Sequence, residues 1–285
     1  MAKIELSTAL VSVSWLKEHI GHPDLVVLDG SWFMPGSERN AIQEYADCHI
    51  PGARFFDFDG EIKDVTSSLP HMLPDANTFS AAVSALGISK STTVVVYDSQ
   101  GIFSAPRVWW MFHAMGHSNV AVLDGGLPAW QSAGYSVTSE KASVIRANDF
   151  EVSVQDAWVI SADELNEVKA KPDVTILDAR PSDRFYGRVP EPREGVRSGH
   201  IPGAKSLPFV QLVKDGYMVD KERLQQRFKA LVESSDDQIV FSCGSGITAC
   251  ILALGAFESG YKQLRVYDGS WTEWGSDSRY PVTLI

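Results

Sequence analysis

The residues best suited to chemistry in this 285-residue chain form a short loop around Cys243. The loop reads Cys-Gly-Ser-Gly-Ile-Thr over residues 243–248, between an apolar run at 239–242 and an apolar stretch expected to form a helix. A helix N-terminus presents unpaired N–H groups, and Gly244 and Gly246 let the backbone curl so that further N–H groups point inward. Such a cradle stabilises a thiolate and would also hold a persulfide anion. We therefore predict that Cys243 is a nucleophile that carries sulfur.

A run of arginines forms the second candidate group. Residues 183–197 contain Arg184, Arg188, Arg193 and Arg197, and their Pro and Gly content predicts a loop. A guanidinium group binds a carboxylate through two parallel hydrogen bonds, so a local arginine cluster can bind an anion even in an acidic protein. The segment alone fits a substrate clamp and a solvated surface loop equally well.

The other cysteines and two of the histidines are interpreted as structural. Cys250 lies in an expected helix of Ala, Ile and Leu, and Cys48 stands where the second half of the chain has Gly199. Three sparse cysteines without a CxxC pair are unlike a disulfide framework or a zinc site, and they indicate a reducing compartment. His49 and His200 begin matching motifs in both halves, whereas the candidate nucleophile occurs in only one.

These residues belong to a chain that repeats itself. His-Ile-Pro-Gly-Ala occurs at 49–53 and again at 200–204. Three further pairs of segments recur in the same order: 26–29 with 175–178, 94–98 with 239–243, and 122–126 with 266–270. The repeat is far longer than the ~20–50 residues of a solenoid unit, so it indicates a duplicated domain. We predict domains at 1–140 and 158–285, with the boundary between Tyr135 and Trp158.

Each half is expected to be an α/β domain, in which a parallel sheet is flanked by helices. The recurring apolar runs are typical of buried parallel strands. Helices are expected at 105–115, at 220–232, at 248–258 and after Ser161, where a capping box begins. Ligands of such sheets bind at the carboxyl ends of the strands, which is where Cys243 lies.

The composition narrows the function class. The formal net charge of −11 and the pI of about 5.1 argue against nucleic-acid binding, which needs a basic face. No run approaches the ~18 apolar residues of a membrane span, and the N-terminus lacks the pattern of a signal peptide. We expect a cytoplasmic protein that does not bind membranes.

The whole chain resembles the tandem-domain rhodanese-like sulfurtransferases. The resemblance rests on both His-Ile-Pro-Gly-Ala motifs, on the strand–Cys–loop–helix unit, and on Trp130 and Trp274 at matching places after the third pair of segments. It implies that Asp98, at the place of the nucleophile in the first half, makes that domain catalytically silent. The loop is similar to the signature of the 3-mercaptopyruvate branch, from which it departs only by Ile247 in place of Val.

The resemblance also assigns residues to the substrate. Arg184 and Arg193 match the substrate-binding arginines of that branch, whereas Arg188 and Arg197 have no match and are interpreted as surface charges. The thiosulfate branch has basic residues where Gly244 and Ser245 stand. The remaining substrate-binding residues are expected from the loop itself: Gly244, Gly246, Ile247 and Thr248.

Proton handling is implied by the resemblance alone. In that family a His and an Asp of the first half act with the loop serine, which here is Ser245, and the matching residues are His71 and Asp59. The spacing from Asp to His is one residue longer than in the relatives, so Asp57 and Asp64 remain alternatives to Asp59.

The resemblance implies 3-mercaptopyruvate sulfurtransferase activity, with one active site between the two domains and no metal or organic cofactor. A thiol such as a thioredoxin cysteine, or cyanide, would accept the sulfur from the Cys243 persulfide. The alternatives are a thiosulfate:cyanide sulfurtransferase and a non-catalytic persulfide relay. A cysteine phosphatase is excluded because such enzymes need an arginine after a longer loop, where this chain has Ala249.

Overall fold

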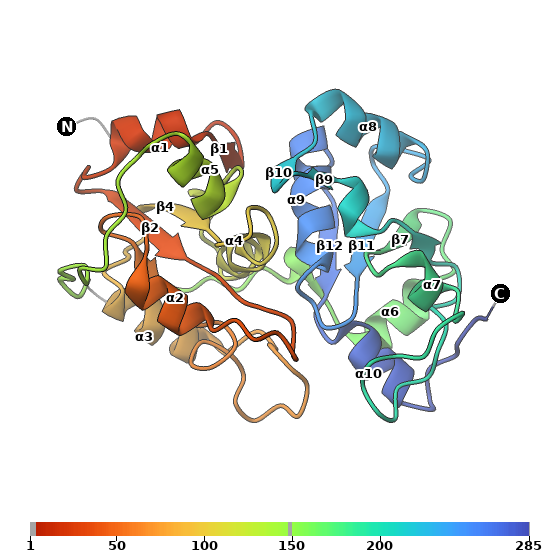
Figure 1. Cartoon of the computed structure of the whole chain (residues 1–285). Helices are drawn as coiled ribbons and strands as arrows, with labels where there is room; N and C mark the ends of the chain where they lie inside the picture. The colour runs from red at the N-terminus through yellow and green to blue at the C-terminus, as the bar shows by residue number, and fades with distance from the viewer. Residues whose placement is uncertain (1–3, 148–149, 285) are drawn as a thin grey trace. The chain divides into compact units, whose positions relative to one another are not determined.

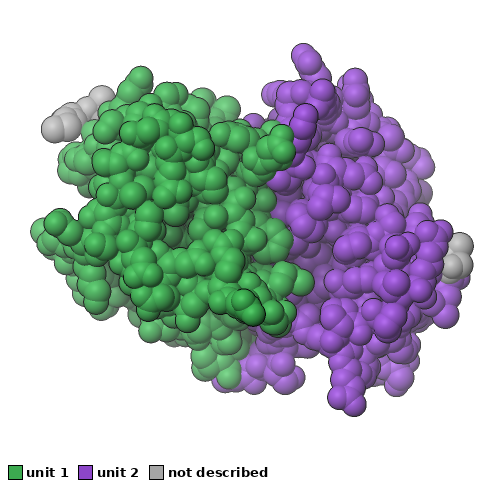
Figure 2. Space-filling model, in the orientation of Figure 1, with its two compact units in different colours: residues 1–65, 73–154, 215–218 green, residues 66–72, 155–214, 219–285 purple. Residues whose placement is uncertain are grey.

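The computed structural model describes residues 4–147 and 150–284. The chain divides into two compact units, coloured separately in Figure 2. Unit 1 comprises residues 1–65, 73–154 and 215–218, and unit 2 comprises residues 66–72, 155–214 and 219–285. None of the helices in the described ranges is long and apolar enough to span a bilayer.

Unit 1 is built on a five-stranded parallel sheet with the strand order β1-β5-β4-β2-β3 (Figure 1). Its strands are β1 (Leu10–Val11), β2 (Leu25–Asp29), β3 (Arg54–Phe55), β4 (Thr93–Tyr97) and β5 (Val120–Leu123), and the short β10 (Tyr217–Met218) also belongs to this unit. Its helices are α1 (Val13–His19), α2 (Ala41–Asp47), α3 (Ala76–Ala85), α4 (Ala105–Ala114) and α5 (Gly126–Ser132).

Unit 2 repeats this plan with the strand order β6-β12-β11-β7-β8, again all parallel. Its strands are β6 (Val159–Ile160), β7 (Val174–Asp178), β8 (Lys205–Ser206), β9 (Val213–Lys214), β11 (Gln238–Ser242) and β12 (Leu264–Tyr267). Its α-helices are α6 (Ala162–Val168), α7 (Ser182–Phe185), α8 (Lys221–Lys229), α9 (Ala249–Ser259) and α10 (Ser270–Ser276), and two 3-10 turns lie at Asp156–Trp158 and Phe209–Gln211.

Buried apolar side chains hold each sheet to its helices. In unit 1, alternate residues of β2, β4 and β5 pack with Leu16 of α1 and Trp130 of α5. In unit 2, Leu165 of α6 and Trp274 of α10 pack in the same way on one face of the sheet. Helix α9 contacts β11, β12 and α8. The period-two alternation of a strand therefore gives each sheet two buried faces.

The predicted fold class is confirmed, and the predicted helices lie where the sequence placed them. Ser161 caps α6 by accepting a hydrogen bond from the N–H of Glu164, as the capping box requires. Asp220 caps α8 in the same way. That helix ends at Lys229, three residues earlier than predicted. The domain limits 1–140 and 158–285 stay a prediction.

Candidate active site

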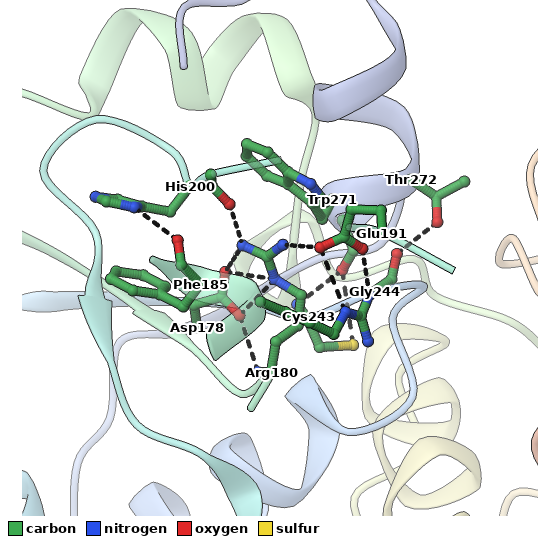
Figure 3. Close-up of polar contacts among 12 residues, drawn as sticks. Asp178, Arg180, Phe185, Glu191, His200, Cys243, Gly244, Trp271 and Thr272 are labelled. Carbon is green, nitrogen blue, oxygen red and sulfur yellow. Dashed lines mark hydrogen bonds and ion pairs between the residues drawn. The ribbon is translucent and has the colours of Figure 1, made fainter. Parts of the chain in front are cut away.

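Cys243, labelled in Figure 3, lies at the carboxyl end of β11, the central strand of the unit 2 sheet. Its side chain is buried, with 2% of the residue exposed. Its sulfur accepts a hydrogen bond from the backbone N–H of Gly246, with an N···S distance of 3.1 Å. Gly246 has a φ of +81°, a left-handed conformation that suits glycine. The turn thus points an N–H group at the sulfur just before α9 begins at Ala249. This arrangement stabilises negative charge on sulfur.

Ser270 holds the backbone of Cys243 from the start of α10. Its hydroxyl accepts the N–H of Cys243 at 3.1 Å and lies 2.9 Å from the carbonyl oxygen of Tyr267, to which it donates. The carbonyl of Cys243 accepts the N–H of Trp271 at 2.9 Å. Ser270 was not predicted as a site residue, although the comparison of Asp-Gly-Ser at 268–270 with Asp-Gly-Gly at 124–126 could have drawn attention to it.

The matching loop of unit 1 already contains an acidic side chain, that of Asp98. The side chain of Asp98, which is fully buried, accepts backbone N–H groups from four residues at 2.9 Å each: Gln100, Phe103, Ser104 and Ala105. Burial raises the pKa of Asp98, and these N–H groups act in the opposite direction. An anion-binding loop is therefore present in both repeats, filled by a carboxylate in unit 1 and bearing a thiol in unit 2.

Arg184 lies beside the loop of Cys243. A β-carbon placed on Gly244 would lie 3.4 Å from Nη2 of Arg184. The side chain of Arg184 is 18% exposed and forms an ion pair with Glu191, whose side chain is buried. The pair fixes the direction of Arg184 and leaves part of its fork open to a second anion.

Arg193 reaches the same loop through Thr272. Its Nη1 donates to the hydroxyl of Thr272 at 3.0 Å. The hydroxyl and N–H of Thr272 both donate to the carbonyl of Gly244, at 2.6 and 2.9 Å. The structure thus brings the two predicted arginines, which lie 51 and 60 residues earlier in the chain, to one loop residue within unit 2.

A buried ion-pair cluster, which sequence reasoning missed, supports this wall of the site. Arg180 is 1% exposed and binds both carboxylate oxygens of Asp178, the last residue of β7 (Figure 3). It also pairs with Glu191 at 2.9 Å, and its guanidinium lies 4.4 Å from the ring centroid of Trp271. Glu191 therefore joins Arg180 to Arg184, so its acidic side chain positions a candidate substrate group.

The other two arginines of the segment differ from each other. Arg188 is exposed and pairs with Asp183 at 3.4 Å, as expected of a surface charge. The interpretation of Arg197 as a surface charge was wrong. Its guanidinium donates to the carbonyl oxygens of four residues at the C-terminal end of α10 and beyond it, namely Trp274, Gly275, Asp277 and Tyr280. A cation satisfies the unpaired carbonyls of a helix end, which gives Arg197 a structural role.

The residues predicted to handle protons lie in different units. Ser245 is half-buried in the loop of Cys243 in unit 2. His71 is 3% exposed, has a φ of +59°, and falls in the segment 66–72 of unit 2. Asp59 belongs to unit 1, where it accepts the indole N–H of Trp32 at 2.9 Å. The pairing of His71 with Asp59, or with an alternative acid, stays a prediction.

His49, His200 and Cys250 contact backbone carbonyl oxygens, which agrees with the structural roles predicted for them. His49 bonds the carbonyls of Tyr45 and Glu140, and His200 bonds the carbonyl of Phe185 and stacks on its ring. Burial lowers the pKa of His200. The thiol of Cys250 is buried and donates to the carbonyl of Gly246, while Cys48 is half-buried. Within the described residues, no three His, Cys, Asp or Glu side chains are grouped as a metal ion would require.

Comparison with known proteins identifies the repeat. The model of the rhodanese-like domain matches residues 12–133 and again residues 161–277. The mitochondrial thiosulfate/3-mercaptopyruvate sulfurtransferase 1 of Arabidopsis thaliana is 44% identical over 305 residues, covering 100% of this chain and 80% of its own length. The 3-mercaptopyruvate sulfurtransferase of Homo sapiens is 40% identical over 281 residues, covering 96% of this chain and 94% of its own.

A solved structure agrees with these relatives. The crystal structure of SseA from Escherichia coli, described as a 3-mercaptopyruvate sulfotransferase with the rhodanese fold, superimposes with a TM-score of 0.83. It is 37% identical and covers 93% of this chain and 99% of its own.

Proposed function

This chain belongs to the family of rhodanese-like domains, and we propose that it is a 3-mercaptopyruvate sulfurtransferase that carries sulfur as a persulfide on Cys243. The observation that carries the proposal is the hydrogen bond from the N–H of Gly246 to the sulfur of Cys243, at 3.1 Å, in a turn that opens α9. Backbone N–H groups cannot be deprotonated at neutral pH, so they favour a thiolate or persulfide anion over the neutral thiol.

In the first step, the Cys243 thiolate attacks the sulfur of 3-mercaptopyruvate. A sulfur–sulfur bond forms while the carbon–sulfur bond breaks, and the electron pair of that bond passes to carbon. Pyruvate leaves as its enolate and takes up a proton. The donor thiol must lose its proton in the same step. One group near the sulfur can therefore accept that proton and then donate a proton to the enolate.

We assign that proton handling to Ser245 with His71 and, as the acid that orients the histidine, Asp59. Ser245 lies two residues after the nucleophile in the same loop. The roles of His71 and Asp59 come from the resemblance to the family, and Asp57 and Asp64 remain alternatives to Asp59.

In the second step, an acceptor thiolate or cyanide attacks the outer sulfur of the persulfide. The sulfur–sulfur bond breaks and its electron pair returns to Cys243, which regenerates the thiolate. A thioredoxin cysteine fits this role because it is an exposed thiol of low pKa. The loop of Gly244, Gly246, Ile247 and Thr248 would hold the persulfide between the two steps.

The carboxylate of the donor is assigned to Arg184 and Arg193. Both contact the loop at Gly244. Arg184 lies directly beside Gly244, and Arg193 reaches it through Thr272. A planar guanidinium binds a carboxylate with a defined orientation, which would direct the thiol of the substrate toward Cys243. A pure persulfide relay has no need of such a clamp, which is why we favour an enzyme.

The donor is the point on which similar proteins differ, since the Arabidopsis relative is named for both thiosulfate and 3-mercaptopyruvate. Thiosulfate leaves sulfite behind, a dianion whose departure is favoured by cations at the loop. Gly244 and Ser245, which follow the nucleophile here, are uncharged. This favours 3-mercaptopyruvate, whose leaving group carries a carboxylate for the arginines.

One assay tests the function. Purified protein is given 3-mercaptopyruvate or thiosulfate with a dithiol or cyanide, and pyruvate, sulfite and the mass of the Cys243 peptide are measured. We expect pyruvate release and the addition of one sulfur to that peptide, and we expect Cys243→Ser to abolish both. Sulfite release exceeding pyruvate release would favour the thiosulfate enzyme. Sulfur found only on Cys250 or Cys48 would overturn the assignment of the nucleophile.

We also propose the domain limits 1–140 and 158–285 and a cytoplasmic location. The support for the location is the sparse set of cysteines, all three of them free thiols. Fractionation of the native host cell, with the protein detected by antibody, would test it.

A further inference from the structure

The two repeats differ in the side chain that covers the aspartate at the end of β2 in unit 1 and of β7 in unit 2. In unit 2, the guanidinium of Arg180 covers Asp178 (Figure 3). It donates to both carboxylate oxygens and to the carbonyl of Gly199 at 2.8 Å, and it packs on the ring of Trp271. In unit 2, Asp178, the carbonyl of Gly199 and the ring of Trp271 thus form a binding site for a guanidinium group, and Arg180 of the same unit occupies it.

The same positions in unit 1 are Asp29, Ser31, Cys48 and Leu127. Equivalent hydrogen bonds establish the match. The N–H two residues after the aspartate donates to its Oδ1 at 2.9 Å in both units, from Ser31 and from Arg180. The N–H of Leu127 donates to the carbonyl of Asp98 as that of Trp271 donates to Cys243. Unit 1 therefore keeps the aspartate but has a short Ser31 where unit 2 has the arginine.

A pocket of about 260 Å³ lies at this place in unit 1. Asp29, Ser31, Cys48 and Leu127 all line it, together with Tyr45 and Gln131. Leucine in place of tryptophan, and serine in place of arginine, remove side-chain volume from the equivalent position. The volume is sufficient for a planar guanidinium group and a few further atoms.

The charges around the pocket favour a cation. Asp29 is 1% exposed and lines the pocket with a carboxyl group that accepts hydrogen bonds from Ser31 and Tyr97, and Asp47 adds a second acidic side chain to the lining. Arg39 also lines the pocket, but its guanidinium is engaged by both oxygens of Glu44 and lies 3.9 Å from the ring centroid of Phe33. A buried carboxylate gains most from a cation that also forms hydrogen bonds, because water is a poor competitor there.

We propose that this pocket of unit 1 binds a small guanidinium-bearing molecule, whose cationic group takes on Asp29 the place that Arg180 takes on Asp178. A planar fork with two parallel N–H groups fits a carboxylate, whereas an ammonium ion is a point charge that cannot reproduce both bonds. The site is distinct from the loop of Cys243 and does not depend on the sulfurtransferase reaction.

The full-length protein is titrated at pH 7.5 with L-argininamide, and binding is followed by calorimetry and by amide NMR shifts of unit 1. L-Lysinamide and glycinamide, at the same ionic strength, separate the guanidinium from simple charge. Saturable binding is expected for argininamide, with affinity falling at least about tenfold for lysinamide and in Asp29→Asn, since each change removes a charge-assisted hydrogen bond.

Two matched variants make the test specific. Glu61→Gln removes one exposed negative charge from the same unit, and it should bind argininamide as the wild type does. The double change Ser31→Arg with Leu127→Trp copies the filled arrangement of unit 2, so it should abolish binding while the protein remains folded by circular dichroism. The proposal is overturned if the wild type shows no saturable binding, or if either the double variant or Asp29→Asn, each folded, binds argininamide undiminished.

Discussion

Ser270 of unit 2 and Gly126 of unit 1 stand at the same place in their repeats, and both have a left-handed backbone, with φ values of +49° and +55°. Serine is strained in this conformation, at a cost of about 1 kcal/mol or more, whereas glycine is not. The strained residue is the one whose hydroxyl bonds the N–H of Cys243 and lies 3.9 Å from its sulfur. The geometry gives the serine a positioning role at Cys243, the proposed nucleophile.

Two substitutions separate the hydroxyl of Ser270 from its backbone. Ser270→Gly relaxes the conformation and Ser270→Ala keeps the strain, but both remove the hydroxyl. We expect both variants to slow alkylation of Cys243 by iodoacetamide, by roughly tenfold for the loss of one hydrogen bond to this loop. Only the glycine variant should match or exceed the thermal stability of the wild type. A normal alkylation rate in both would remove Ser270 from the site.

Arg184 and Arg193 are each expected to discriminate between donors. Changing either to Lys keeps the charge but loses bidentate geometry, so KM for 3-mercaptopyruvate should rise by about tenfold or more. Thiosulfate has no carboxylate and should be affected less. Arg188→Lys, an exposed residue of the same segment, is the control and should leave both donors unchanged. Equal losses with both donors would indicate general damage to the fold.

Charge at the loop should set the preference for a donor. Gly244 does not have a positive φ, so an arginine there would meet no backbone strain, but its β-carbon would approach the guanidinium of Arg184 to 3.4 Å. Ser245→Lys alone adds a cation without placing a second guanidinium group beside Arg184, and it removes the hydroxyl proposed to handle protons. The ratio of kcat/KM values should move toward thiosulfate. If Cys243 remains reactive to iodoacetamide and the ratio does not move, loop charge does not select the donor.

Asp29 predicts a pH dependence of stability. Burial raises its pKa from 3.8 to about 6, against hydrogen bonds from Ser31 and Tyr97 that lower it. Between these pH values the native state binds more protons than the unfolded state, so the free energy of unfolding falls as pH rises, by roughly 3 kcal/mol in all. Asp29→Asn should flatten this decline between pH 4 and 6.5 in urea titrations. An unchanged slope in the variant would assign the pH dependence to other groups.

The repeat and the loop were predictable because both depend on local sequence. Apolar runs, the capping Ser161 and the glycines of the Cys243 turn each specify their own structure over a few residues. Contacts made across the fold were not predictable in this way. Ser270 lies 27 residues after the cysteine it holds, and its backbone contradicts the ordinary preference of serine. Arg197 was misread because its partners are carbonyls, which leave no signal in a sequence.

Glu191, beside the arginines proposed to bind the substrate, is a second residue whose contacts could not be predicted from local sequence. The sequence places it between two arginines of the candidate clamp, but nothing local reveals that it is buried against Arg180 and Arg184 together. Its position depends on β7 and on the loop after α7, which meet only when the sheet has formed.

The side chain of Asp98 occupies the turn of the first repeat and accepts the N–H groups that an external anion would need. A free anion would have to displace a ligand that is covalently attached to the strand and therefore present at an effective concentration far above that of any cellular solute. The fold thus retains two copies of this turn, and we expect only the copy in unit 2 to exchange its contents with the solution. Both repeats share the architecture of the turn, and we expect the side chain at this position, Asp98 or Cys243, to determine which copy can carry out chemistry.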